Sequence, residues 1–409
     1  MQKESVHIQK NSSPKTISIP LASSKSESNR VLIMKELAGE KAVLHNLSSA
    51  RDTQIMKKLL SSDDEELSVL DAGTVMRFMT GFLTLSKKER ILTGTDRMCQ
   101  RPIGLLVDAL NQIGSDIKYV GNEGFPPLKI KGTGIQKTNK LEIPGNISSQ
   151  YISALLMIAP ELPQGLEISL CGEVYSLPYI KMTLSLMSRF GISHSFSGNT
   201  ISIAPQKYQA AEYTVESDWS GASYWYSIVA LSENASIKLL GLRKHSYQGD
   251  SAIVEIMEQL GVKSEFEDDG VLLTKIDAEE HLDYDFRNCP DLAQTIFTVG
   301  AAKGISMEMT GLESLKIKES DRTAAMSTEL AKIGASLFEK DDKTWKLTVD
   351  KDFQVESSLV FDTYDDHRMA MALAPLATRF DISIKEPEVV KKSYPEYWQH
   401  LELAGFKLS

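Results

Sequence analysis

The stretch IVEIMEQLGVKSEF at residues 253–266 joins a segment of helical periodicity, a glycine and a strand-like segment. Its apolar residues recur at the spacing of one helix face up to Gly261. Glycine adopts the left-handed backbone conformation that closes a helix, so Gly261 is expected to end this one. The stretch is therefore typical of an α/β protein.

Five other stretches have the same order of helix, glycine and strand. They are IMKELAGEKAVL (33–44), LVDALNQIGSDIKYV (106–120), LSLMSRFGISHSF (184–196), MSTELAKIGASLF (326–338) and YWQHLELAGFKLS (397–409). The glycines follow one another at intervals of 70 to 77 residues, and they are Gly39, Gly114, Gly191, Gly261, Gly334 and Gly405. We interpret the regular spacing as six units of about 70 residues, each with two helices and three or four strands. The alternative is that unrelated α/β elements happen to be evenly spaced.

Length and composition narrow the class of protein. A chain of 409 residues is expected to form two or three domains. Apolar residues make up 42% and charged residues 24%, which is typical of a globular enzyme. The net charge of −10 disfavours a general binder of nucleic acid or anionic membranes, although a local basic pocket is compatible with it.

Cysteine and histidine usage predicts neither a disulfide framework nor a metal site. The three cysteines form no C-x-x-C pair, and the seven histidines form no H-x-x-x-H pair. The first fifteen residues lack the apolar core of a signal peptide, and no apolar run is long enough to span a membrane. We expect a cytoplasmic protein. A phosphotransferase is disfavoured, because the sequence has no G-x-x-x-x-G-K-[ST] loop.

Polar residues open several of the expected helices. These openings are SSKSESNR (23–30), DAGTVMR (71–77), SSQ (148–150), CPD (289–291), KESDR (318–322) and YDDHR (364–368). Ser, Thr and Asp are ordinary N-caps, but capping does not require the cations that accompany them. Those cations are Lys25, Arg30, Arg77, Lys318, Arg322 and Arg368. Because a helix N-terminus already favours anions, the combination predicts anionic ligands.

These openings, together with further motifs, resemble the 5-enolpyruvylshikimate-3-phosphate synthase family. The further motifs are RMCQRPIGLLVDAL (97–110), GNISSQYISALLMIAP (145–160), SLPYI (176–180), PDLAQT (290–295) and KKSYPEYW (391–398). The motifs follow the family's order from about residue 21 to 398. The resemblance implies transfer of enolpyruvyl from phosphoenolpyruvate to the 5-hydroxyl of shikimate 3-phosphate. Phosphate is released through a tetrahedral intermediate, without a metal or organic cofactor, in aromatic amino acid biosynthesis.

The resemblance also implies a fold of two similar domains, each made of three βαβαββ-type units. One domain would comprise residues 1–22 and 217–409 and the other residues 23–216, with the active site in the cleft between them. The chain would act as a monomer on its two small-molecule substrates.

By the same resemblance, a set of mostly cationic residues binds phosphoenolpyruvate. They are Lys25, Gly73, Arg101, Gln150, Arg322, Arg368 and Lys392. Arginine suits a ligand with a carboxylate and a phosphate, since it binds either group through two parallel hydrogen bonds. Arg101 precedes Pro102, which disfavours α geometry and is typical of a loop. Lys391 remains an alternative to Lys392.

The shikimate 3-phosphate contacts implied by the family are mainly hydroxyls and cations. They are Lys25, Ser26, Arg30, Ser148, Ser149, Gln150, Ser176, Tyr179, Asp291, Ser314 and Lys318. Ser148 and Ser149 directly precede an apolar helical run, where two hydroxyls and free N–H groups suit a phosphate. As simple N-caps they would be equally ordinary.

The implied catalytic residues are Lys25, Asp291 and Glu319. The reaction adds a proton to the methylene carbon of phosphoenolpyruvate and removes one from the 5-hydroxyl, and we assign Glu319 to the carbon and Asp291 to the hydroxyl as a hypothesis. Asp291 could instead be a first-turn acid that offsets the helix dipole. Glu319 could be one half of a helical ion pair with Arg322.

The chain departs from the usual family motifs at a few positions. Ala22 and Ser23 replace Pro-Gly, Asp71 replaces Asn and adds a negative charge, Phe78 replaces Pro, and Ser314 replaces Asn. We expect Phe78 to shift the helix that presents Gly73.

Two alternative functions remain open at this stage. The related UDP-N-acetylglucosamine enolpyruvyl transferases carry a reactive cysteine before the corresponding arginine, but Cys99 lies only two residues before Arg101, closer than in that family. A non-catalytic anion-binding relative would lack the proton-transfer residues, which are present here.

Overall fold

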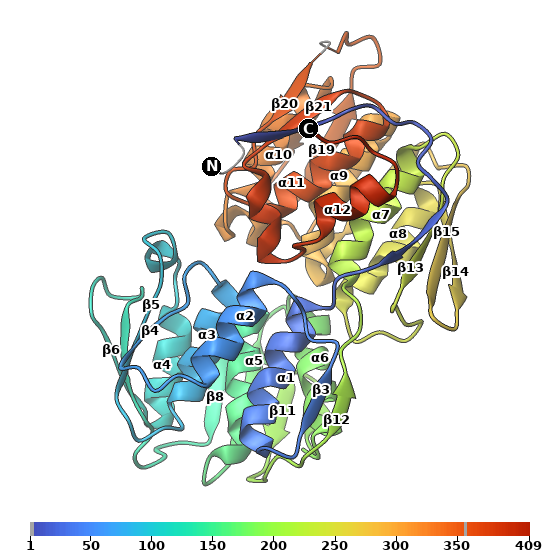
Figure 1. The fold of residues 1–409 in the computed structure, drawn as a ribbon. Coiled ribbons are helices and arrows are strands. Elements are labelled where there is room, and N and C mark those ends of the chain that lie inside the picture. Colours follow the sequence, from blue (N-terminus) through green and yellow to red (C-terminus); the bar gives the residue numbers. More distant parts are fainter. Residues whose placement is uncertain (1–3, 356–357) are drawn as a thin grey trace. The chain divides into compact units, whose positions relative to one another are not determined.

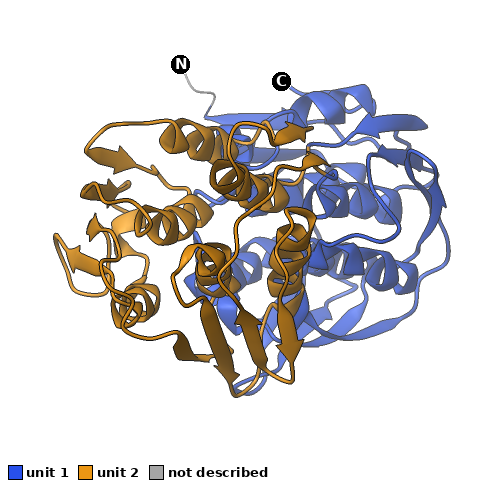
Figure 2. Cartoon of the chain, turned by 90° about the horizontal axis from the view of Figure 1, so that it is seen from below, with its two compact units in different colours: residues 1–22, 216–409 blue, residues 23–215 orange. Residues whose placement is uncertain are grey.

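The computed structural model describes residues 4–355 and 358–409, and the chain divides into two compact units. Unit 1 comprises Met1–Ala22 and Glu216–Ser409, and unit 2 comprises Ser23–Val215. Figure 1 shows the elements of both, and Figure 2 gives each unit its own colour. Residues 1–3, at the start of the expected domain 1–22, lie outside the described residues.

One topology occurs four times. Two parallel strands are connected through a helix, and a second helix leads into an antiparallel hairpin whose last strand pairs with the second parallel strand. In unit 2 the first copy consists of β4 (Glu66–Ser68), α3 (Gly73–Leu83), β5 (Arg90–Thr93), α4 (Gly104–Ile113), β6 (Asp116–Tyr119) and β7 (Leu128–Lys131). The second consists of β8 (Lys140–Pro144), α5 (Ser149–Ile158), β9 (Leu166–Cys171), α6 (Leu177–Arg189), β10 (Ser195–Ser197) and β11 (Thr200–Ile203).

Unit 1 holds the other two copies of this topology. One consists of β2 (Ile17–Pro20), α7 (Trp219–Leu231), β13 (Ser236–Leu240), α8 (Ile253–Gln259), β14 (Val262–Glu267) and β15 (Gly270–Lys275). The other consists of β16 (His281–Asp285), α9 (Ala293–Lys303), β17 (Ser306–Thr310), α10 (Arg322–Ala331), β18 (Ala335–Glu339) and β19 (Trp345–Val349).

The two remaining repeats are assembled from distant parts of the chain, as is the repeat that begins with β2. In unit 1, β20 (Leu359–Phe361), α11 (His367–Leu373), β21 (Ile382–Lys385) and α12 (Tyr397–Leu403) are completed by the N-terminal strand β1 (Ser5–Ile8), which pairs antiparallel with β21. In unit 2, β3 (Val43–His45) lies parallel to β12 (Glu212–Thr214) and is flanked by α1 (Lys25–Ala38) and α2 (Arg51–Leu60). The expected α/β architecture of six units, three in each half, is confirmed, but the sheet of β3 and β12 has two strands where three or four were expected.

The six repeat glycines all have a positive φ, between 80° and 126°. Five of them follow the second helix of their repeat, as the regular spacing suggested. Gly39 is the exception, because it follows α1, the first helix of its repeat, while α2 ends at Leu60 and has Ser61 rather than a glycine as its C-cap. The even spacing therefore located the repeats correctly but not the equivalent helix in every one.

The first helices of the repeats form the interior of each unit. In unit 1, α7, α9 and α11 pack against one another, and every residue of α7 except Ser220 is buried. In unit 2, α3 packs against both α5 and α1. Helices that are apolar on all sides are typical of such positions. Polar residues on them are concentrated in the first turns, where the expected site residues lie.

Within the described part of the chain, no helix has the length and apolar character needed to cross a membrane.

Candidate active site

Arg322 is the centre of the polar cluster in unit 1. It is the first residue of α10, and only 2% of its side chain is exposed. Its Nε donates to Asp366 Oδ2 at 2.7 Å, its Nη1 to Asp291 Oδ1 at 3.0 Å and its Nη2 to Glu319 Oε2 at 2.9 Å. Burial disfavours the cation, but the charges of these three carboxylates raise the pKa of Arg322 above its ordinary value. A fixed guanidinium charge is thus held away from water.

Asp291 lies in a short turn (Pro290–Leu292) that leads directly into α9. Besides Arg322, its carboxylate contacts Arg368 Nη2 at 2.9 Å and Lys318 Nζ at 3.7 Å. Burial by itself would raise its pKa, yet the charges of Arg368, Lys318 and Arg322 hold the pKa of Asp291 well below its ordinary value. Three of the residues expected from the sequence therefore share one carboxylate.

Glu319 joins two of the expected cations. Its second oxygen, Oε1, lies 3.4 Å from Lys392 Nζ, and the Lys392 side chain is only 4% exposed. The neighbouring Lys391 is 56% exposed and pairs with Glu388 instead. The Glu319–Arg322 pair forms at the expected spacing, but Glu319 lies before α10 rather than inside a helix, so this is not the helical ion pair considered above. Ser314 lies in the preceding short helix, Glu313–Ile317.

Asp366 was not among the residues predicted from the sequence. It is fully buried, accepts from Arg322, and also caps α11 by accepting from the Arg368 backbone N–H at 2.9 Å. Its sequence context indicated only an N-cap, and its second role depends on the position of α10. The two residues before it, Tyr364 and Asp365, have positive φ angles of 53° and 59°. The Tyr364 hydroxyl donates to the buried Glu329 at 2.8 Å, which supports this strained turn.

Lys25 begins α1 in unit 2, where the Ser24 side chain caps the helix. Its Nζ donates to Asp52 Oδ2 at 3.2 Å, and Asp52 is 2% exposed. Asp52 was also missed from the sequence, because as a first-turn acid of α2 it resembles an ordinary partner of the helix dipole. The pair holds a lysine ammonium at the start of a helix.

Gly73 and Arg101 are brought into direct contact. A Cβ atom on Gly73 would lie 2.7 Å from Arg101 Nη1, so this position has no room for a side chain while Arg101 keeps its place. Arg101 has the extended backbone that Pro102 predicts, with φ −91° and ψ 126°. Thr74, the residue after Gly73, accepts a hydrogen bond through its Oγ1 from Gln150 Nε2 at 3.1 Å, which connects α5 to α3. Three of the expected phosphoenolpyruvate ligands thus gather at the start of α3.

Arg30 connects the beginnings of α1, α5 and α6. Its guanidinium donates to Thr183 Oγ1 at 2.7 Å, to Ser153 Oγ at 3.1 Å and to the Ser26 carbonyl at 2.9 Å. Burial lowers its pKa to about 10, which still leaves it charged at neutral pH. Ser148 caps α5, Ser149 is its first residue, Ser176 precedes α6 in a left-handed conformation with φ 54°, and Tyr179 lies in the first turn of α6. The expected shikimate 3-phosphate ligands of this unit therefore lie at neighbouring helix ends.

The structure explains two of the departures from the family motifs. Asp71 is paired with Arg51, whose Nη2 lies 2.7 and 2.8 Å from its two carboxylate oxygens, so its charge is locally compensated. Phe78 is buried, and the Arg30 guanidinium lies over its ring at 5.1 Å. The helix that carries Phe78, α3, nevertheless begins at Gly73.

Arg77 faces the protein backbone. Its guanidinium donates to the carbonyls of Gly73 at 3.1 Å and Pro102 at 3.2 Å. We infer that this cation holds the start of α3 against the Arg101 loop.

Comparison with known proteins identifies the family. Residues 58–401 match the family described as EPSP synthase (3-phosphoshikimate 1-carboxyvinyltransferase). A 3-phosphoshikimate 1-carboxyvinyltransferase of Bacteroides fragilis is 49% identical over 391 residues, which cover 95% of each chain. The enzyme of the same name from Psychromonas ingrahamii is 38% identical over 416 aligned positions, covering 94% of this chain and 95% of its own.

A solved structure of EPSP synthase from Acinetobacter baumannii has the same fold. It superimposes with a TM-score of 0.78 over 99% of this chain and 100% of its own, at 18% sequence identity. The two-domain α/β fold is thus shared at low sequence identity.

Replacement of the central cation tests the electrostatics of the cluster. We expect Arg322→Gln to lower the free energy of unfolding at pH 8 by about 3–5 kcal/mol, because it leaves three buried carboxylates without their shared partner. The charge of Arg322 helps to hold the pKa of Asp291 below its ordinary value of about 4, so its loss raises that pKa, and the deficit should shrink as the pH falls from 8 to 3. Urea unfolding at both pH values measures it.

Arg287→Gln is the matched control for this substitution. Arg287 is 35% exposed and lies 3.4 Å from Asp285, and such a surface pair contributes less than about 1 kcal/mol. A deficit for Arg322→Gln that is equally small, or that does not change with pH, would contradict the proposed electrostatics.

Proposed function

The chain belongs to the EPSP synthase family and is therefore a carboxyvinyl transferase, and we propose that its two units supply different parts of the substrate contacts. The reaction transfers the enolpyruvyl group of phosphoenolpyruvate to the 5-hydroxyl of shikimate 3-phosphate. Both substrates are anions, and each unit presents buried cations at helix ends. A metal ion is not needed for the assignment of any residue below.

The observation that carries the proposal is the set of buried cations in unit 1. Arg322, Arg368 and Lys392 are each paired with carboxylates of the protein. We propose that the carboxylate and phosphate of phosphoenolpyruvate contact the same cations when it binds. A substrate anion that replaces a carboxylate in one of these contacts would be strongly attracted to the cation, because the buried surroundings have a low dielectric constant.

Unit 2 contributes the remaining phosphoenolpyruvate contacts through Lys25, Gly73, Arg101 and Gln150. The backbone N–H groups at the start of α3 and the Arg101 guanidinium both favour an anion, and Gly73 leaves space next to them. We assign the phosphate of shikimate 3-phosphate to the hydroxyls of Ser148, Ser149 and Ser176. Its remaining contacts are assigned to Lys25, Ser26, Arg30, Gln150, Tyr179, Asp291, Ser314 and Lys318.

The reaction requires two proton transfers at carbon and one at oxygen. Attack of the 5-hydroxyl oxygen on C2 of phosphoenolpyruvate forms a C–O bond while C3 gains a proton, which gives a tetrahedral intermediate. Loss of a C3 proton and departure of phosphate then restore the double bond. We assign the C3 proton to Glu319 and the hydroxyl proton to Asp291, with Lys25 at the reacting centre.

The contacts of Asp291 are compatible with its assigned role. Asp291 is held as a weak base by its three cationic neighbours. Binding of an anion to Arg368 or Arg322 would weaken that effect and raise the pKa of Asp291, so that the carboxylate becomes a stronger base when substrate is present.

We further propose that the enzyme acts as a cytoplasmic monomer without nucleic-acid or membrane partners. The net charge of −10 and the three free cysteines support this part of the proposal.

The two adjacent lysines offer a sharp test of the phosphoenolpyruvate assignment. We expect Lys392→Ala to lower kcat/KM for phosphoenolpyruvate by about 100-fold or more, because it removes a buried cation from the substrate contacts. Lys391→Ala, which removes an exposed cation one residue away, should stay within twofold of the wild type. Phosphate release in the presence of shikimate 3-phosphate measures both. Equal effects of the two substitutions would contradict the assignment.

The proton assigned to Glu319 can be followed separately. In D₂O with shikimate 3-phosphate, the wild type should incorporate deuterium into the methylene group of phosphoenolpyruvate as the intermediate forms and reverts. Glu319→Gln should slow this exchange by about 100-fold or more, because the amide cannot exchange a proton with carbon. NMR of the recovered substrate measures it, and Glu388→Gln provides a surface control. Exchange at the wild-type rate in Glu319→Gln would refute the assignment.

A further inference from the structure

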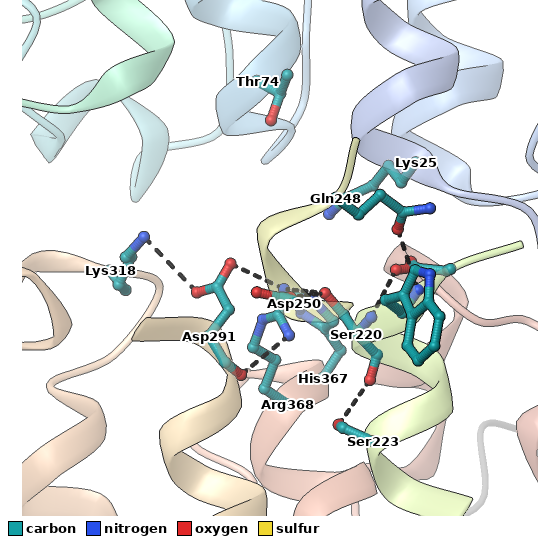
Figure 3. Close-up of polar contacts among 12 residues, drawn as sticks. Lys25, Thr74, Ser220, Ser223, Gln248, Asp250, Asp291, Lys318, His367 and Arg368 are labelled. Atoms are coloured by element: carbon teal, nitrogen blue, oxygen red, sulfur yellow. Dashed lines mark hydrogen bonds and ion pairs between the residues drawn. The ribbon is translucent and has the colours of Figure 1, made fainter. Parts of the chain in front are cut away.

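Arg368 has a second polar partner that its proposed role does not explain. Its Nη1 donates to the Asp291 backbone carbonyl at 3.3 Å and its Nη2 to Asp291 Oδ2 at 2.9 Å. Nη2 also lies 3.4 Å from Ser220 Oγ, so this one nitrogen contacts both Asp291 and Ser220 (Figure 3). The guanidinium is therefore held by two residues.

Hydrogen bonds around the first turn of α7 fix the position of Ser220 next to Arg368. It is the only residue of α7 that is not buried, and its backbone N–H donates to the N-cap Asp218 at 2.9 Å. Its carbonyl accepts from Ser223 Oγ at 2.7 Å, and Ser223 Oγ in turn lies 3.1 Å from Thr295 on α9. These contacts fix the first turn of α7 against α9, which begins just after Asp291.

The Ser220 hydroxyl proton points to a buried carboxylate. Ser220 Oγ donates to Asp250 Oδ2, and Asp250 is only 2% exposed, in the short helix Gly249–Ala252. A serine hydroxyl has one proton and two lone pairs. Because the proton is directed to Asp250, the lone pairs are available to the guanidinium of Arg368. The hydroxyl thus connects a buried anion to a cation of the proposed site.

The charges around Asp250 are compatible with an ionised carboxylate. Burial raises its pKa to about 6, with a further contribution from the charge of Asp291, while Arg368 and the Ser220 hydrogen bond oppose the rise. Asp218 and Cys289 also face it. At pH 8 the Asp250 carboxylate is therefore charged and accepts the Ser220 proton.

From these contacts we propose that Ser220 and Asp250 are positioning residues that aim the Arg368 guanidinium at phosphoenolpyruvate. The other contact of the Arg368 guanidinium described above is to Asp291, which is assigned to proton transfer. The pair therefore holds the cation in place while the Asp291 carboxylate changes its charge. This inference rests on the proposed contact between Arg368 and phosphoenolpyruvate.

The kinetic constants for the two substrates at pH 8 test the inference. Ser220→Ala should raise KM for phosphoenolpyruvate about five- to tenfold and leave KM for shikimate 3-phosphate within twofold of the wild type. Asp250→Asn should have a similar effect. Because both residues act through one hydrogen bond, the double variant should be no worse than the more affected single variant. Ser227→Ala, on the same helix but at a buried hydroxyl that makes no hydrogen bond to the described residues, should match the wild type.

Arg368→Lys separates the inference from the assignment it rests on. A raised KM for phosphoenolpyruvate in Arg368→Lys together with an unchanged KM in Ser220→Ala would overturn the positioning role alone. Two other results would also overturn the positioning role, because a general structural defect would produce them. One is an equal increase in the KM values for both substrates in Ser220→Ala, and the other is a double variant whose KM increase is the product of the two single increases. An unchanged KM in Arg368→Lys would overturn the assignment of Arg368 and the inference with it.

Discussion

The polar cluster of unit 1 depends on one buried guanidinium. Burying the charge of Arg322 at 2% exposure would be costly without Asp291, Glu319 and Asp366, and those carboxylates would be costly to bury without cations. Each carboxylate comes from a different segment: the start of α9, the loop before α10 and the start of α11. Their shared contact to Arg322 therefore fixes three helix beginnings together. In the function that we propose, it also holds the cations in place for the anionic substrates.

Much of the fold could be predicted from the sequence because each repeat contains a helix–glycine–strand segment that is continuous in the chain. A helix, a glycine and a strand are adjacent in the chain, so Gly114 or Gly261 marks its repeat without any long-range information. Gly39 shows the limit of this signal, since it ends the first helix of its repeat rather than the second. The pairing of β1 with β21 was beyond local reasoning as well, because it depends on where the chain terminus lies in space.

The site could be predicted in part, for a related reason. Cations at helix beginnings conflict with capping preferences, so Lys25, Arg322 and Arg368 were distinctive in the sequence. Some of the carboxylates near them were not, because Asp52, Asp250 and Asp366 satisfy the ordinary preference for acids at helix starts. Their second role becomes visible only when another element supplies the cation. The same holds for Asp71, whose added charge is compensated by Arg51 from the neighbouring helix.

The transfer of an enolpyruvyl group to shikimate 3-phosphate is the central claim, and the choice of acceptor tests it most directly. Phosphate release from phosphoenolpyruvate can be measured with shikimate 3-phosphate and, in parallel, with UDP-N-acetylglucosamine. We predict release with shikimate 3-phosphate only. Release with UDP-N-acetylglucosamine alone would contradict the account.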